Sequence, residues 1–133
     1  MTAKDQFQRV MNRYLERYAA HDPEGCADLY AETGVILSPY GPPAIGRAAI
    51  RDEHAAWFLE GETNKSMIVL DAALDGAAGF CLVAYSADVP GDNGPMRVHG
   101  ASVNTLTKDK DGDWLIQQTS LNELEHDMTQ AFT

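Results

Sequence analysis

The sequence predicts an α+β fold in which a cone-shaped, curved antiparallel sheet wraps around three N-terminal helices. Apolar residues recur at helical spacing near the N-terminus, and strand-like segments follow one another from Lys65 onward. Because the helices precede a run of hairpin-connected strands, we expect an antiparallel sheet with the helices gathered on one face. The chain has 133 residues, so we expect one domain over residues 1–133.

The first predicted elements are two helices. Apolar side chains between Phe7 and Tyr18 fall on one face, which predicts an amphipathic helix over residues 3–20. The pair Asp22–Pro23 combines an N-cap carboxylate with a proline suited to the first helical position. This pair predicts a short second helix that runs as far as Tyr30.

A short strand and a third helix are predicted next. Val35–Ser38 is typical of a strand, and the prolines and glycine of Pro39–Pro43 then break the chain. The third helix is predicted over residues 46–61, with His54 on its apolar stripe and Gly61 suited to its C-terminal end.

Four longer strands are predicted in the second half of the chain. They are separated by turn sequences and form consecutive hairpins, over residues 65–75, 79–89, 96–108 and 114–124. A curved sheet with helices on its concave face leaves a mouth of the kind that small-molecule pockets favour. The strands carry apolar side chains on both faces, which predicts a homodimer formed through the outer sheet face.

The composition restricts the partners and the cellular location. A formal net charge of −10 disfavours binding to nucleic acids and to anionic membranes. No apolar run approaches the ~20 residues of a membrane span, and the first residues lack the apolar core of a signal peptide. We therefore expect a cytoplasmic protein with Cys26 and Cys81 as buried free thiols.

Motifs for cofactors and metals are weak or absent. The sequence has no glycine-rich phosphate loop and no Gly-x-Ser-x-Gly nucleophile motif. Glu123 and His126 form a Glu-x-x-His pair without further metal ligands, and the turn Asp109–Asp113 lacks most ligands of a calcium loop. We expect neither a cofactor nor a metal.

Three strings resemble the nuclear transport factor 2-like superfamily, which includes ketosteroid isomerases and SnoaL-like polyketide cyclases. They are "RYLERYAAHDPEGCADLYAETGVIL", "GPPAIGRAAIRDEHAAWF" and "DKDGDWLIQQTSLN". The resemblance covers nearly the whole chain and implies a cystatin-like α+β barrel with a pocket for a small apolar or polyketide-like molecule. The likeness is strongest to SnoaL-like proteins of uncharacterised activity. A fold shared by many activities does not identify the reaction.

The resemblance also suggests which residues to compare with ketosteroid isomerase. In that enzyme an aspartate base moves the proton, while a tyrosine and a protonated aspartate hold the oxyanion. The tyrosine falls on Tyr14, the base on Ser38 and the second aspartate near Ser102 or Val103. Since a serine hydroxyl is a very weak base, ketosteroid isomerase activity is not expected, and Ser38 is interpreted as a hydrogen-bonding group of the pocket.

Two residues are candidates for catalysis. Tyr14 is a candidate oxyanion donor, and the alternative is a core tyrosine whose hydroxyl finds an internal partner. His99 is a candidate acid or base, and the alternative is a histidine on the surface or dimer face. Because side chains alternate along a strand, His99 and Asn104 cannot both face the pocket without a bulge.

The candidate ligand-binding residues carry hydrogen-bonding or aromatic side chains. They are Tyr18, Ser38, Trp57, Tyr85, Asn104 and Gln118. Tyr18 has the same core alternative as Tyr14, and Trp57 is expected to form apolar wall. Tyr85 and Gln118 have a cross-strand or dimer contact as their alternative.

Two functions from different classes remain open. The first is a cofactor-free isomerase, cyclase or hydrolase that works by acid/base chemistry, with Tyr14 and either His99 or a bound water handling the proton. The second is a non-catalytic dimeric module that binds a ligand or a protein. A filled cone interior would leave only a protein-binding role.

Overall fold

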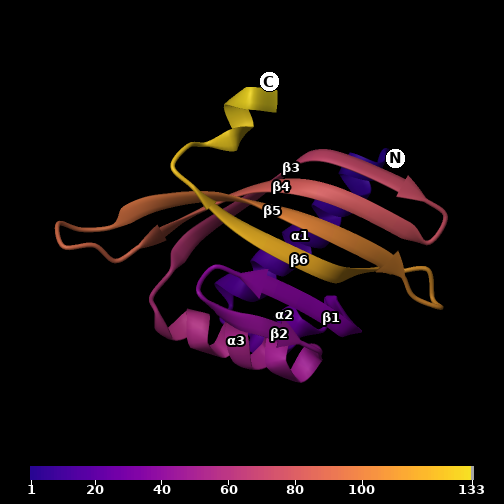
Figure 1. Ribbon diagram of the computed structural model, residues 1–133, viewed down its shortest axis with the longest axis horizontal. Helices are drawn as coiled ribbons and strands as arrows, with labels where there is room; N and C mark the ends of the chain where they lie inside the picture. The colour runs from indigo at the N-terminus through magenta and orange to yellow at the C-terminus, as the bar shows by residue number, and fades with distance from the viewer. Residues whose placement is uncertain (133) are drawn as a thin grey trace.

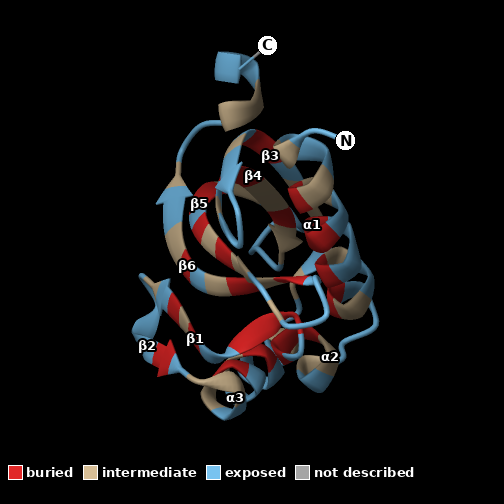
Figure 2. Cartoon of the chain, turned by 90° about the vertical axis from the view of Figure 1, so that its right-hand side faces the viewer, coloured by how far each residue is buried: buried red, intermediate tan, exposed pale blue. Residues whose placement is uncertain are grey.

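The computed structural model describes residues 1–132 and contains one curved six-stranded sheet with helices on its concave side (Figures 1 and 2). In chain order the elements are α1 (Ala3–Ala19), α2 (Pro23–Ala27), β1 (Tyr30–Ser38), β2 (Gly41–Ile45), α3 (Arg47–Leu59), β3 (Thr63–Asp75), β4 (Ala78–Val89), β5 (Met96–Lys108), β6 (Trp114–Leu124) and the 3₁₀ helix η1 (Met128–Phe132). The predicted α+β class is confirmed. None of the helices in residues 1–132 has the length and apolar character needed to cross a membrane.

The strands follow the order β2-β1-β6-β5-β4-β3 across the sheet (Figure 1). The four long strands β3, β4, β5 and β6 pair as antiparallel neighbours, as their hairpin turns predict. One pairing differs from the prediction, because β1 lies parallel to β6. Nothing in the local sequence of β1 specifies its distant partner, so the parallel pairing was not predictable from turn signals.

The predicted proline break is itself part of the sheet. Pro39 and Tyr40 form a tight turn, and Gly41–Ile45 returns as the antiparallel strand β2. A proline lacks the N–H that a central strand needs, so prolines are confined to edges. Strand β2 is the edge of the sheet, which is why Pro42 and Pro43 are tolerated there.

The second helix is shorter than predicted. Asp22 accepts a hydrogen bond from the Gly25 N–H at 2.9 Å, as expected for the N-cap, but α2 ends at Ala27. Tyr30 already belongs to β1, and its backbone oxygen accepts a hydrogen bond from Arg47 Nε at 2.8 Å. The helix therefore ends three residues earlier than predicted, and the chain enters the sheet at Tyr30, five residues before the predicted strand start at Val35.

The core lies between α1 and the concave face of the sheet (Figure 2). Phe7 is fully buried and meets Trp114 edge-to-face, with 5.0 Å between the ring centroids. Gly79 of β4 lies against the Phe7 ring, where a Cβ atom would collide with it. Cys26 and Cys81 are buried free thiols, as predicted.

Candidate functional site

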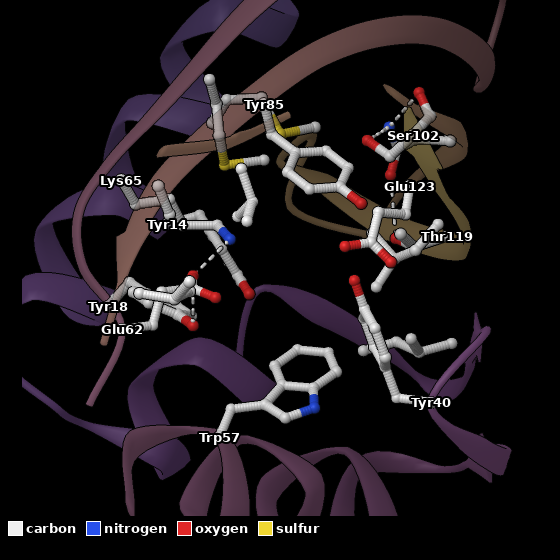
Figure 3. A pocket seen from close by; sticks show the side chains of 18 of the residues that line it. Tyr14, Tyr18, Tyr40, Trp57, Glu62, Lys65, Tyr85, Ser102, Thr119 and Glu123 are labelled. Carbon is white, nitrogen blue, oxygen red and sulfur yellow. Dashed lines mark hydrogen bonds and ion pairs between the residues drawn. The ribbon is translucent and has the colours of Figure 1, made fainter. Parts of the chain in front are cut away.

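A cavity of about 360 Å³ opens between the concave face of the sheet and the helices α1 and α3. All five tyrosines of the chain lie on its wall: Tyr14, Tyr18, Tyr30, Tyr40 and Tyr85. They come from helix α1, from strands β1 and β4 and from the β1–β2 turn, and most are labelled in Figure 3. The volume lies in the range of small-molecule sites, and a mainly apolar wall with a few polar groups is typical of them.

The cavity brings together five of the eight residues singled out in the sequence. Tyr14, Tyr18, Trp57, Tyr85 and Asn104 line it. The structure places the other three elsewhere, His99 and Gln118 because of strand register and Ser38 because of a turn.

His99 lies on the outer face of the sheet. Strand β5 pairs with β4 in unbroken register, with His99 opposite Ser86 and Asn104 opposite Cys81. Asn104 is 2% exposed and lines the cavity, so alternation along the strand turns His99 away from it. Of His99 and Asn104, Asn104 is therefore the residue that faces inward.

Gln118 lies on the outer face because of a β-bulge. The register between β5 and β6 shifts where Thr105 pairs with Gln118 but Leu106 pairs with Ile116. The extra residue reverses the alternation, so that Ile116 and Thr119 both face the cavity. Gln118 is left exposed on the outer face. The sequence carries no signal for the bulge, so simple alternation places Gln118 on the inner face instead.

Ser38 stabilises the turn between β1 and β2. Its Oγ accepts a hydrogen bond from the backbone N–H of Tyr40 at 3.1 Å. Ser38 is half-buried but is not on the cavity wall. The turn that Ser38 supports instead places Tyr40, which does line the cavity.

The most deeply buried polar contact at the cavity joins Tyr14 to His54. The Tyr14 hydroxyl oxygen lies 2.6 Å from His54 Nε2, and His54 Nδ1 lies 2.8 Å from the carbonyl oxygen of Ile50. A carbonyl oxygen only accepts, so Nδ1 carries the ring proton and Nε2 is the acceptor. Tyr14 therefore donates its single proton to His54.

Burial holds both members of this pair neutral. His54 is 0% exposed, and this desolvation lowers its pKa to about 4. Burial likewise raises the pKa of Tyr14 well above its ordinary value. Because the Tyr14 hydroxyl donates its hydrogen bond to His54, it offers only lone pairs to the cavity. This is the reverse of the oxyanion-donor role that the resemblance implies.

A second set of hydrogen bonds forms a buried polar chain. The Thr119 hydroxyl donates to Asn104 Oδ1 at 2.8 Å, so the Tyr30 hydroxyl, 2.9 Å from Thr119 Oγ1, must donate to it. Asn104 Nδ2 in turn donates to Ser102 Oγ at 3.0 Å. Ser102 donates to no acceptor among residues 1–132, so its hydroxyl proton is available inside the cavity.

The third polar group joins an ion pair to two rings. The Tyr18 hydroxyl and Lys65 Nζ both donate to Glu62 Oε1 at 2.9 Å. Lys65 Nζ lies 4.7 Å from the centroid of the Tyr18 ring and 5.2 Å from that of Tyr85 (Figure 3). The ammonium group is thus held between a carboxylate and two aromatic faces.

Gly100 makes room for Tyr85. Tyr85 of β4 is the pairing partner of Gly100 on β5. A Cβ atom at position 100 would collide with the Tyr85 ring. The Tyr85 hydroxyl then donates to the Asn122 backbone oxygen at 3.3 Å. A glycine in a strand interior often marks such a close approach.

Several wall residues were not singled out in the sequence. Tyr30, Tyr40 and Thr119 were missed because their positions depend on the strand boundary, the hairpin and the bulge. His54 carried a usable signal, since it lies on the apolar stripe of the third helix, where a polar side chain requires a buried partner.

A model of the SnoaL-like domain family matches residues 11–115. No curated protein matches the chain in sequence. Solved structures do match it. A ketosteroid isomerase-like protein from Erwinia carotovora atroseptica superposes with a TM-score of 0.79 at 13% identity, over 92% of this chain and 97% of that one.

Two further solved structures share the fold. A nuclear transport factor 2-like protein with a cystatin-like fold from Novosphingobium aromaticivorans has a TM-score of 0.73 at 16% identity, over 98% of this chain and 88% of that one. A protein from Catenulispora acidiphila in complex with S-DNPA has a TM-score of 0.74 at 20% identity, over 90% of this chain and 91% of that one. At these identities the likeness shows the fold.

Proposed function

The chain belongs to the SnoaL-like domain family, and on that premise we propose that it binds a small, largely apolar molecule in the cavity beneath the curved sheet. The observation that carries this proposal is the cavity of about 360 Å³. Its wall combines aromatic and methionine side chains with the buried hydroxyl groups of Tyr14 and Ser102, which are open to a ligand. Such a wall holds an apolar body and fixes its orientation by a few polar contacts.

The two polar groups differ in what they offer a ligand. Ser102 presents a hydroxyl proton, so it suits a carbonyl, ether or hydroxyl oxygen of the ligand. Tyr14 presents lone pairs, because its hydroxyl donates its hydrogen bond to His54, so it suits an N–H or O–H donor of the ligand. A ligand with one acceptor and one donor separated by an apolar body satisfies both.

A cavity-filling substitution tests the proposal. Ala87 is 1% exposed on the cavity wall, so Ala87→Phe places a ring in the space that the ligand needs. The matched control is Ala73→Phe at an exposed position of β3. The probe is N-phenyl-1-naphthylamine, an uncharged fluorophore that brightens in apolar surroundings.

The wild type and Ala73→Phe are expected to bind the fluorophore saturably with one site per chain, whereas Ala87→Phe loses that binding. Native mass spectrometry of the purified protein adds an independent readout, since a retained ligand appears as a fixed mass increment. Equal fluorophore binding by wild type and Ala87→Phe, or no saturable binding by the wild type, contradicts the proposal.

Acid/base catalysis is a second candidate, favoured by the Tyr14–His54 pair. With a bound water taking the proton that leaves the ligand, the negative charge that develops on the ligand competes with His54 Nε2 for the Tyr14 hydrogen bond. The Tyr14 hydroxyl can then rotate and donate to the ligand. Neither His99 nor Ser38 lies on the cavity wall, so neither is assigned a role in this chemistry. Loss of turnover in both Tyr14→Phe and His54→Gln is expected in an assay that the wild type passes, and full turnover in Tyr14→Phe contradicts it.

We also propose that two copies associate through the outer face of the sheet, as the alternative function of a dimeric binding module requires. Ile68, Phe80 and Val103 expose 46%, 36% and 40% of their surface there. This face offers uncharged contact area to a second copy in a chain whose net charge of −10 otherwise repels it. Light scattering is expected to give a dimer for the wild type and a monomer for Val103→Asp, and a monomeric wild type contradicts it.

A further inference from the structure

The cavity wall carries an excess of negative charge. Its charged side chains are three glutamates, Glu60, Glu62 and Glu123, and one lysine, Lys65. Lys65 is paired with Glu62 at 2.9 Å. Neither Glu60 nor Glu123 has an ion-pair partner among residues 1–132, so two carboxylates of the wall remain uncompensated.

These carboxylates act on one region of the wall. Partial burial and the nearby carboxylate of Glu123 raise the pKa of Tyr40 to about 12. Glu62 and Glu60 add to the same shift. The negative potentials of the three glutamates therefore overlap at the Tyr40 side chain. Figure 3 shows Tyr40, Glu123 and Trp57 around the same space.

The aromatic wall already accommodates an ammonium group. Lys65 Nζ lies within cation–π distance of the Tyr18 and Tyr85 rings. Trp57 and Tyr40 present further rings to the cavity that no cation of residues 1–132 covers. Trp57 and Glu60 stand three residues apart at the end of α3, so a ring and a carboxylate lie on neighbouring positions of the helix surface.

We propose that the molecule bound in this cavity is an organic cation, with a protonated or quaternary amine on an apolar body. The ammonium group lies between the rings of Trp57 and Tyr40 and the carboxylates of Glu60 and Glu123. The apolar body extends inward to the wall formed by Met11 and Ile36. This inference rests on the proposed ligand cavity and adds the chemical class of its ligand.

The same arrangement selects against anions. A carboxylate at this end of the cavity would face two unpaired glutamates, and repulsion between like charges disfavours such a ligand. Fatty acids and polyketide-like molecules that carry a carboxylate are therefore poor ligands for this cavity, although their apolar bodies would fit its wall.

Three probes with the same apolar body test the inference by calorimetry at low ionic strength. They are phenylbutylamine, phenylbutanol and phenylbutyrate, which carry a cation, a neutral hydroxyl and an anion on one frame. The amine is expected to bind about tenfold more tightly than the alcohol, as cation–π contacts and nearby carboxylates both contribute. The carboxylate is expected to bind more weakly than the alcohol.

Isosteric variants identify the charges responsible. Glu60→Gln and Glu123→Gln are each expected to weaken the amine about two- to fivefold while leaving the alcohol unchanged. Glu24→Gln, an exposed glutamate of α2 that is not on the cavity wall, is the matched control and keeps the wild-type preference.

The outcomes separate the ligand class from the cavity itself. If the alcohol binds as tightly as the amine, or if neither glutamine variant changes the ratio of their affinities, the organic-cation inference is overturned and the ligand cavity stands. If none of the three probes binds and N-phenyl-1-naphthylamine also fails to bind, the proposed function fails and the inference fails with it.

Discussion

The buried His54 makes the stability of the fold depend on pH in a calculable way. Its pKa is lowered to about 4 in the folded chain by burial, against an ordinary value of 6.5. Between these values the unfolded chain binds a proton that the folded chain does not. The contribution of neutral His54 to stability is therefore complete above about pH 6.5 and is lost as the pH falls toward about 4.

The magnitude follows from the separation of the two pKa values. Each unit corresponds to about 1.4 kcal/mol, so acidification from about pH 7.5 to about pH 5 removes about 2 kcal/mol through His54 alone. Carboxylates titrate over part of the same range and change the total. The difference between the wild type and His54→Gln isolates the contribution of this histidine, because the variant has no titratable group at position 54.

Urea unfolding at a series of pH values measures this difference. The free energy of unfolding of the wild type is expected to fall by about 2 kcal/mol more than that of His54→Gln across the interval. His126→Gln removes an exposed histidine near the C-terminus and serves as the control with wild-type behaviour. Parallel pH profiles for the wild type and His54→Gln would refute the neutral, proton-accepting His54 on which the Tyr14 assignment depends.

Three further predictions concern packing and buried polarity. Gly79→Ala drives a Cβ into the Phe7 ring and is expected to cost about 1–3 kcal/mol in urea unfolding, whereas Gly41→Ala, where a Cβ meets nothing within 4 Å, leaves stability near that of the wild type. Thr119→Val leaves Tyr30 and Asn104 without their shared partner and is expected to cost about 1–3 kcal/mol, while Thr105→Val on the outer face costs much less; equal losses would contradict the buried chain. Gly100→Ala displaces Tyr85 from the wall and is expected to weaken N-phenyl-1-naphthylamine binding, and unchanged binding would show that Tyr85 is not part of the site.

The long elements of the fold were predictable because they rest on local signals. Helix α1 follows from the apolar spacing between Phe7 and Tyr18, and the four hairpin strands follow from their turns. The edge strand β2 was not predictable, because two prolines oppose a strand in general and only its edge position permits them. The parallel pairing of β1 with β6 depends on contacts between segments far apart in the chain.

The site was predictable where helical spacing decided orientation. Tyr14 and Tyr18 are one turn apart on the apolar stripe of α1, and both line the cavity. On the strands the orientation depended on register. A single bulged residue turned Gln118 outward and Thr119 inward, and unbroken pairing with β4 turned Asn104 inward and His99 outward. The partner of Tyr14 was visible in the sequence only as a polar residue on an apolar stripe.

The methionines of the chain offer the most direct test of the central claim, that a small molecule occupies the tyrosine-lined cavity. Met11, Met67 and Met96 line it, while Met1 and Met128 do not. The measurement is the methyl NMR spectrum of protein labelled at the methionine methyl carbons, titrated with phenylbutylamine. We predict saturable shifts at Met11, Met67 and Met96 with Met1 and Met128 unchanged. Shifts confined to Met1 and Met128, or no saturable shift at any methionine, would contradict the account.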